Sequence, residues 1–239
     1  MRASRQLFFG LKPIYSFPYY PCLERPGNCQ QPLQAFNIIY TTTQYSIFSN
    51  ATFVESNFYK IMINVLLAFA AGIAFWTLME YVLHRFLGHV HKGKNFFKHE
   101  HLQHHYKVNY FAPAFKKAIA SLVVSAVLVG LLSLLMAFSV ALAFIVGLIG
   151  MYGLYELIHF RFHSTDPLAM VFIVFRKHHF YHHFHNPKSN FGVTTRFWDR
   201  VFCTFYPVEM VVVPRKMPLK WLMAEEGIKD SYTKHFRIS

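Results

Sequence analysis

The chain has 239 residues, of which 54% are hydrophobic and only 15% are charged, so it is richer in apolar residues than an ordinary soluble domain. Lysine and arginine outnumber aspartate and glutamate by 24 to 11, which by itself would suit either a nucleic acid or an anionic lipid surface. The sequence lacks the interleaved basic and aromatic residues of an RNA-binding sheet, and we therefore expect a membrane protein that binds no nucleic acid.

The chain begins with a segment of mixed polar and aromatic composition. Residues 1–58 combine Pro, Tyr, Gln, Asn and Thr without helical periodicity, which predicts an irregular or disordered extension. We expect the residues before Met62 to be dispensable for folding and activity.

Two long apolar stretches follow this extension. Residues 61–79 carry no charge and fit one bilayer crossing of about 20 residues. Residues 118–155 are also uncharged, but a single helix of that length, at about 1.5 Å per residue, would be nearly twice as long as the hydrocarbon core is thick. We interpret them as two crossings joined by a tight turn near Phe138. The sequence thus predicts an all-α integral membrane protein with about three transmembrane helices.

The basic residues predict how these helices are oriented. Seven Lys or Arg lie from Arg85 to Lys117 and twelve lie after residue 160, whereas the turn near Phe138 has none. The positive-inside rule places such basic segments on the cytoplasmic side of the membrane.

Fourteen of the fifteen histidines fall in two blocks, residues 84–105 and 159–185. Ten of them form four ordered clusters, and a repeated H-x-x-H-H element is hard to obtain by accident. We predict that these ten are metal ligands, whereas His91, His99, His178, His185 and His235 lie outside the clusters and are not. The clusters are His84 with His89; His101, His104 and His105; His159 with His163; and His179, His182 and His183.

Helical spacing explains why these clusters suit a metal. Residues three or four apart lie on one face of an α-helix, so each H-x-x-H-H element is expected to bring its three imidazoles to a shared point. His84 and His89 are five residues apart, which corresponds to about 140° on an ideal helix. They need a helix end or separate metals, and we expect the helix to end near Gly88.

The order of clusters and crossings points to one shared site. The first cluster follows the first crossing, the second precedes the next crossing, and a hairpin of two crossings returns the chain before His159. All four clusters therefore lie on one membrane face, where they would form a histidine-rich helical cap on the cytoplasmic side.

The ligand type and number narrow the choice of metal. Ligation by imidazole alone suits iron, zinc, copper or nickel rather than magnesium or calcium. Ten ligands exceed the capacity of one ion, and two ions with about five nitrogens each would keep open positions for water or dioxygen. Two iron ions are favoured, with zinc as a substitute, because the membrane surroundings imply a lipid substrate, and cleaving an unactivated C–H bond requires redox chemistry that zinc cannot supply.

Two motifs carry a resemblance to a known family. The first runs Trp76-x-Leu78-x-Glu80-Tyr81-x-x-His84-Arg85-Phe86-Leu87-x-His89. The second runs from His179 through His183 and continues as Lys188-Ser189-x-Phe191-Gly192-Val193-Thr194-Thr195-x-x-Trp198-Asp199-x-x-Phe202-x-Thr204. Over roughly residues 75–207 the chain resembles the fatty acid hydroxylase and sterol desaturase superfamily, and within it the fatty acid 2-hydroxylases.

The resemblance implies a diiron oxygenase that uses O2 to hydroxylate a fatty acyl chain at carbon 2. A fused haem domain with its His-Pro-Gly-Gly motif, common in eukaryotic members, is not seen, so we expect electrons from a separate b-type cytochrome or a ferredoxin and its reductase. The expected location is the inner membrane if the source is bacterial and the endoplasmic reticulum if it is eukaryotic.

Site residues and domain limits complete these expectations. Glu80 lies four residues before His84 and Glu156 three before His159, so each carboxylate is expected to accept a hydrogen bond from the other ring N–H of a metal-bound imidazole. Tyr155 and Asp199 are further supporting residues. We expect a hydroxylase domain over residues 59–210 and a C-terminal tail over residues 211–239.

Other functions remain open from the sequence. A sterol or carotenoid oxidase or desaturase of the same superfamily would use the same clusters. A noncatalytic metal-binding or metal-transporting membrane protein is a different class, but a transporter should carry polar residues at mid-membrane, and the crossings here are almost wholly apolar. Structural zinc would need only four ligands.

Overall fold

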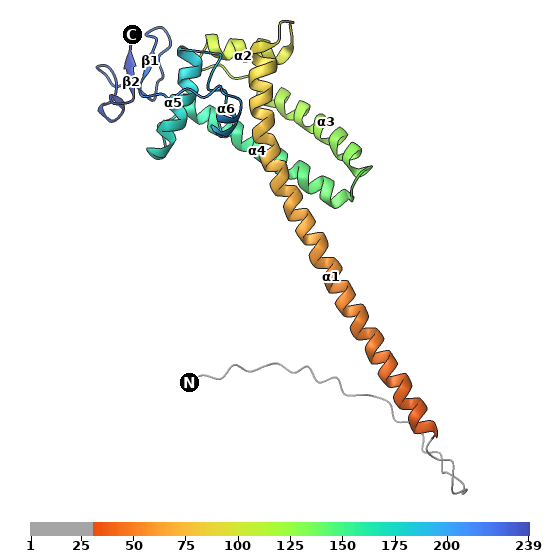
Figure 1. The fold of residues 1–239 in the computed structure, drawn as a ribbon. Coiled ribbons are helices and arrows are strands. Elements are labelled where there is room, and N and C mark those ends of the chain that lie inside the picture. The colour runs from red at the N-terminus through yellow and green to blue at the C-terminus, as the bar shows by residue number, and fades with distance from the viewer. Residues whose placement is uncertain (1–30) are drawn as a thin grey trace, which may run out of the picture. The chain divides into compact units, whose positions relative to one another are not determined.

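The computed structural model describes residues 31–239. The chain divides into two compact units, residues 1–56 and residues 57–239. Within the second unit, α2, α5 and α6 gather near the C-terminal end of α1, and α3 and α4 form a hairpin (Figure 1).

The first helix, α1, runs from Gln31 to Val82 and continues as a π-helix, η1, from Leu83 to Val90. The prediction of an irregular segment up to residue 58 is therefore wrong for residues 31–58, while residues 1–30 lie outside the described residues. Residues 33–71 contain neither proline nor glycine, so nothing interrupts helical hydrogen bonding once it has begun, even without an apolar face.

Five more helices follow. The first of them, α2, runs from Phe96 to Tyr106 and is capped by Asn95, whose side chain accepts a hydrogen bond of 2.7 Å from Lys98 N. The others are α3 (Ala114–Ser133), α4 (Phe138–Ser164), α5 (Val171–Phe184) and α6 (Phe197–Val201).

Within residues 31–239, three helical segments are long and apolar enough to cross a membrane: residues 54–90, 114–133 and 138–164. The predicted turn near Phe138 is confirmed, since α3 ends at Ser133 and α4 begins at Phe138. The turn needs no glycine or proline because Leu134 N and Leu135 N bond back to the carbonyls of Leu131 and Leu132.

The helices α1 and α4 cross at two glycines. Gly72 of α1 faces the backbone of α4, and Gly147 of α4 faces the backbone of α1. A Cβ on Gly72 would lie 2.0 Å from Phe144 O, and a Cβ on Gly147 would lie 2.1 Å from Phe69 O. Only glycine allows such an approach. This crossing fixes α1 against α4. Beyond it, α1 continues into η1, which carries His84, and α4 carries His159.

Residues 211–239 form a folded unit, so the expectation of a simple tail, and of an all-α protein, is corrected. Strand β1 (Val211–Val213) pairs in parallel with β2 (Phe236–Ile238), and the short 3₁₀-helix η2 (Asp230–Tyr232) lies between them in the chain. The core of this unit packs against Ile173 and Phe180 of α5. It contains Val211, Val213, Leu219, Trp221, Leu222, Tyr232 and Phe236.

Candidate metal centre

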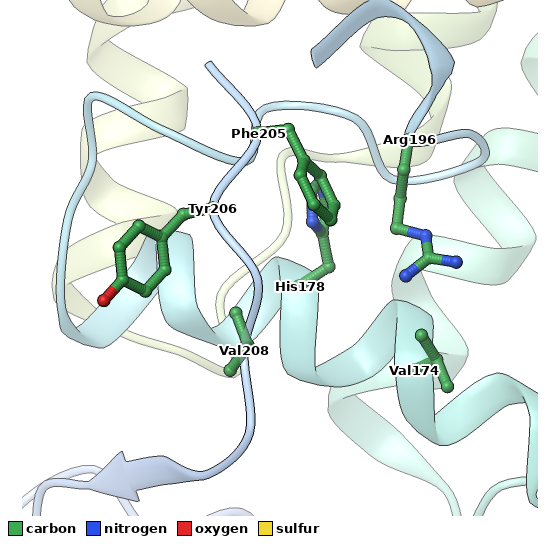
Figure 2. Close-up of a pocket in the computed structure, with 6 residues that line it drawn as sticks. All are labelled: Val174, His178, Arg196, Phe205, Tyr206 and Val208. Atoms are coloured by element: carbon green, nitrogen blue, oxygen red, sulfur yellow. The ribbon is translucent and has the colours of Figure 1, made fainter. Parts of the chain in front are cut away.

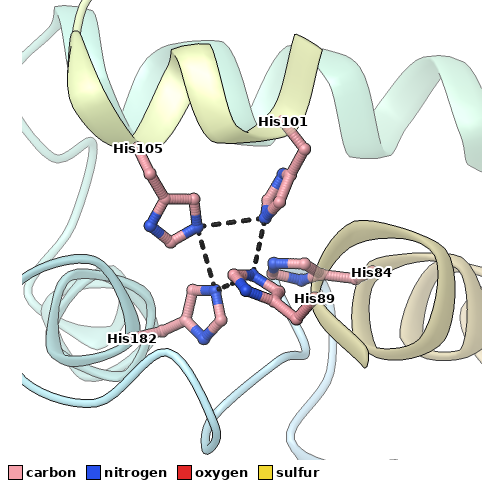
Figure 3. A group of neighbouring side chains, drawn as sticks. All are labelled: His84, His89, His101, His105 and His182. Carbon is pink, nitrogen blue, oxygen red and sulfur yellow. Dashed lines mark hydrogen bonds between the residues drawn. The ribbon is translucent and has the colours of Figure 1, made fainter. Parts of the chain in front are cut away.

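The ten predicted histidines come together in two groups of five. In each group, one ring nitrogen per residue lies within 4.8 Å of the corresponding nitrogen of every other member. The first group is His84, His89, His101, His105 and His182 (Figure 3); the second is His104, His159, His163, His179 and His183.

The three imidazoles of each H-x-x-H-H element do not meet at one shared point, as was expected, but are divided between the two groups. On α2, His101 and His105 belong to the first group and His104 to the second. On α5 the arrangement is reversed, because His179 and His183 belong to the second group and His182 to the first. Each of the two helices thus contributes an i, i+4 pair to one group and the remaining histidine to the other.

The π-helix η1 explains the five-residue spacing of the first box. A π-helix forms i→i+5 hydrogen bonds, and His91 N accordingly donates to Phe86 O at 2.8 Å. Residues five apart therefore lie above one another, and the rings of His84 and His89 are 5.4 Å apart between centroids. The helical segment ends at Val90, close to the predicted end at Gly88, but neither a helix end nor separate groups accounts for the spacing.

Four Nε2 atoms of the first group form a closed ring (Figure 3). Its sides measure 2.8 Å from His89 to His101, 3.0 Å from His101 to His105, 3.1 Å from His105 to His182 and 3.0 Å from His182 to His89. With metal–nitrogen bonds of about 2.1 Å, ligands at right angles lie about 3.0 Å apart and tetrahedral ligands about 3.4 Å apart. The ring therefore fits right-angled coordination better than the tetrahedral coordination of a structural zinc.

Hydrogen bonds between the imidazoles do not account for every nitrogen lone pair of the first group. His182 Nδ1 lies 2.8 Å from Ser189 O, and because a carbonyl only accepts, Nδ1 carries the hydrogen and Nε2 carries a lone pair. The same reasoning applies to His84, whose Nδ1 donates to Phe191 O at 2.5 Å. His84 Nε2 is buried with no hydrogen-bond partner among the described residues. A cation among the five nitrogens would accept all of these lone pairs.

The second group also contains imidazole nitrogens that lie close together and buried Nε2 atoms without a hydrogen-bond partner among the described residues. His163 Nε2 lies 2.8 Å from His179 Nε2, and His104 Nδ1 donates to Tyr110 O at 2.7 Å. Nε2 of His104, His159 and His183 is buried and unpartnered among the described residues. The two groups touch through His105 and His183, whose rings stack at 4.1 Å. The residues therefore fit two metal ions held side by side.

Burial keeps the imidazoles outside the apolar spans uncharged. Loss of hydration lowers the pKa of His105 to about 2 and that of His104 to about 4, from an ordinary value of 6.5. The same cause lowers the pKa of His101, His179, His182 and His183 well below 6.5. Metals bind the neutral form of imidazole, so the groups are in the protonation state that binding requires.

The carboxylates expected to contact metal-bound histidines have other partners. Glu80 accepts hydrogen bonds from Val193 N at 2.5 Å and Thr194 N at 3.0 Å, rather than from His84. Glu156 forms an ion pair with Lys117 rather than a contact with His159. Nδ1 of His84, His104 and His182 donates instead to backbone carbonyls, which no residue type in the sequence marks and which sequence reasoning missed.

Asp199 and Tyr155 lie beside the groups in different ways. Asp199 is fully buried and accepts from His178 Nε2 at 2.9 Å, which turns His178 away from both groups. The ring of Tyr155 stacks on that of His159 with 5.6 Å between centroids.

The remaining histidines lie outside both groups. His185 Nε2 accepts from Val212 N at 2.9 Å, His91 lies beside Gly93 O, and the side chain of His99 is 69% exposed. A small pocket borders His178 and has no carboxylate or second imidazole in its lining (Figure 2). Its lining residues are Val174, His178, Arg196, Phe205, Tyr206 and Val208.

Comparison with known proteins agrees with the motifs quoted above. A sequence model of fatty acid hydroxylases matches residues 69–204, a range that contains all ten histidines. The chain belongs to the fatty acid hydroxylase family. The resemblance inferred from the two motifs is thereby confirmed.

Individual members of the fatty acid hydroxylase family match the same region. Mouse fatty acid 2-hydroxylase is 35% identical over 151 residues, covering 59% of this chain and 40% of the mouse protein. A dihydroceramide fatty acyl 2-hydroxylase of Arabidopsis thaliana is 34% identical over 146 residues, covering 56% of this chain and 59% of that protein. The chain thus spans only about half the length of these curated relatives.

A solved structure of full-length scs7p, in which only the hydroxylase domain is visible, matches with a TM-score of 0.50 and 27% identity. The match covers 62% of this chain and 61% of that one.

Proposed function

We propose that this chain is a membrane-embedded dimetal hydroxylase that inserts one oxygen atom of O2 into a C–H bond of a lipid acyl chain, at the carbon next to the carbonyl. In this reaction R–H, O2, two electrons and two protons yield R–OH and water. The observation that carries the proposal is the pair of five-nitrogen groups within a chain of this family.

The two groups would each hold one metal ion through five imidazole nitrogens. Five nitrogens for each ion would leave room for an exchangeable ligand. When bound, two iron ions would supply the redox chemistry that activates O2, which zinc does not provide. The chain's own residues supply the lone pairs and keep the imidazoles neutral, and backbone carbonyls orient the rings of His84, His104 and His182 through hydrogen bonds.

The apolar helices favour a lipid substrate. Large apolar side chains on α3 and α4 are exposed, among them Leu122 at 70% and Phe138 at 61%, and exposed apolar surfaces of this kind favour contact with lipid. The basic segments after Arg85 and after residue 160 favour a cytoplasmic location for the histidines. An acyl chain lying along the helices with its head at the interface would bring the carbons next to the carbonyl to the metals.

The electrons would come from a separate carrier, either a b-type cytochrome or a ferredoxin with its reductase. This requirement follows from the balance of the reaction: the C–H bond supplies two of the four electrons that reduce O2 to one hydroxyl group and one water, and the other two must come from outside.

Oxygen labelling tests the proposal. The full chain would be expressed in cells that lack 2-hydroxy fatty acids and supplied with ¹⁸O₂. We expect one ¹⁸O atom in the 2-hydroxyl group of the lipid-bound acyl chain. A new double bond, with label only in water, would replace the hydroxylase with a desaturase, and the absence of any lipid product in cells with a competent donor would overturn the proposal.

Two histidine variants provide the matched control for this test. His163→Ala removes a nitrogen from the second group and should lower the labelled product at least 100-fold, because ligand residues act as a unit. His99→Ala changes an exposed imidazole outside both groups and should leave the product within about twofold of the parent, as surface substitutions usually do.

A further inference from the structure

The segment that follows the last histidine cluster, residues 188–204, lies against one face of α1 and η1. Trp198 Nε1 donates to Thr77 Oγ1 at 2.9 Å, and Tyr81 OH bonds to Thr204 Oγ1 at 3.0 Å. The residues of α1 and η1 that join this contact recur every three or four positions, as residues on one helical face do. They are Thr77, Glu80, Tyr81, His84 and Arg85, whose guanidinium lies over the ring of Phe191.

Two buried carboxylates hold the backbone of this segment. Asp199 accepts from Phe191 N and Gly192 N, each at 2.8 Å, and from Thr204 Oγ1 at 2.8 Å, in addition to His178. Glu80 holds the next two residues through Val193 N and Thr194 N, and it also accepts from the Thr194 hydroxyl. Four consecutive backbone N–H groups, from residue 191 to residue 194, are therefore fixed by carboxylates.

The carbonyls of the same segment face the first histidine group. Ser189 O accepts from His182 Nδ1, and Phe191 O accepts from His84 Nδ1. Each contact fixes one ring and directs its Nε2 lone pair inward. In the second group, His104 has its carbonyl partner in a different segment, at Tyr110.

We propose that residues 189–194 are a positioning loop for one metal site only, the site of His84 and His182, and that Asp199 and Glu80 are its positioning residues. The inference rests on the proposed two-metal centre. The loop orients two of the five nitrogens of the first group, so loosening it weakens that site while leaving the second site intact.

The two carboxylates differ in how they respond to conversion to an amide. Each oxygen of Asp199 accepts from a backbone N–H, so in either orientation Asp199→Asn places its NH2 against such a donor. Glu80 accepts both backbone N–H groups on one oxygen, and the other oxygen faces a hydroxyl that can also accept. Glu80→Gln can therefore keep its bonds, and it should have a smaller effect.

The test is a count of iron per chain, by elemental analysis, in the full-length protein purified in detergent from iron-supplemented cells. The parent should hold two equivalents. Asp199→Asn should hold one equivalent firmly and release the other to a ferrous chelator with an affinity about 10- to 100-fold weaker, the usual cost of losing an outer partner of a metal-bound histidine. Glu80→Gln should lie between the parent and Asp199→Asn.

Asp166→Asn serves as the matched control, because Asp166 is an exposed carboxylate paired with Lys229 and lies outside the loop. It should keep both equivalents. Double variants identify the weakened site: Asp199→Asn with His163→Ala should retain almost no firmly bound iron, whereas Asp199→Asn with His84→Ala should match His84→Ala alone.

The outcomes separate the inference from the proposed function. A well-folded parent with fewer than two metal equivalents would overturn the two-metal centre itself. A parent with two equivalents would overturn the positioning loop if Asp199→Asn kept both with unchanged chelator release, or lost both equally. If Asp199→Asn fails to accumulate, Thr204→Val removes only one of the four hydrogen bonds to Asp199 and should give a smaller loss at the same site.

Discussion

Each histidine of the two groups must stay uncharged to offer a lone pair, and burial imposes this state before any metal binds. Burial lowers the pKa of His104 to about 4 and that of His105 to about 2. In the unfolded chain the same side chains have a pKa near 6.5. Between these values only the unfolded chain binds protons, so acid favours unfolding.

We therefore expect the metal-free protein to lose stability as the pH falls from 7 toward 4. One unit of lowered pKa corresponds to about 1.4 kcal/mol, so His104 alone would contribute roughly 3 kcal/mol over this range. Thermal unfolding of the chelator-treated protein at a series of pH values measures the effect. A midpoint that stays constant from pH 8 to pH 5 would contradict it, and His99→Ala should follow the parent's curve.

The helices determine how these residues come together, and only part of the helix arrangement could be predicted from the sequence. The three apolar spans and the turn near Phe138 could be predicted from the stretches without charged residues, because the thickness of the bilayer sets the length of a helix that crosses it. The division of each H-x-x-H-H element between two groups could not be predicted from the sequence. Spacing gives the angle between side chains on one helix, but it does not say which neighbouring helix each angle faces.

The crossing of α1 and α4 yields a prediction at the same scale. Gly72→Ala and Gly147→Ala place a methyl group 2.0 Å and 2.1 Å from a facing carbonyl oxygen, so the helices must separate. We expect a loss of about 1–3 kcal/mol or more for each, seen as a lower thermal midpoint in detergent. Gly150→Ala and Gly153→Ala are controls on α4, the helix of Gly147, because nothing lies within 4 Å of either added methyl group. Equal midpoints for all four variants would show that the close crossing does not matter.

For the molecule as a whole, the C-terminal residues are part of the folded protein. Trp221 is only 4% exposed, and its ring lies 4.3 Å from the guanidinium of Arg176 on α5, three residues before His179. Sequence reasoning missed this unit because its strands are three residues long and pair across more than twenty intervening residues, so no local periodicity marks them.

We expect Trp221→Ala to cost about 3–5 kcal/mol, because it removes a large buried ring and uncovers Arg176. Resistance to protease in detergent should fall together with the thermal midpoint. Met210→Ala changes a side chain that is 39% exposed just before β1 and should behave as the parent does. Unchanged resistance in Trp221→Ala would indicate that residues 211–239 do not stabilise α5.

The π-helix at the first histidine box has a consequence for how such boxes vary in length. One residue inserted into an α-helix would rotate everything beyond it by about 100°, unless the insertion is taken up locally as a wider turn. Here the wider turn spans Leu83–Val90 and ends where the helix itself ends. A residue added or removed within this wider turn would therefore leave the contacts of α1 unchanged, so the spacing of a histidine box at a helix end can change without disturbing the helix that carries it.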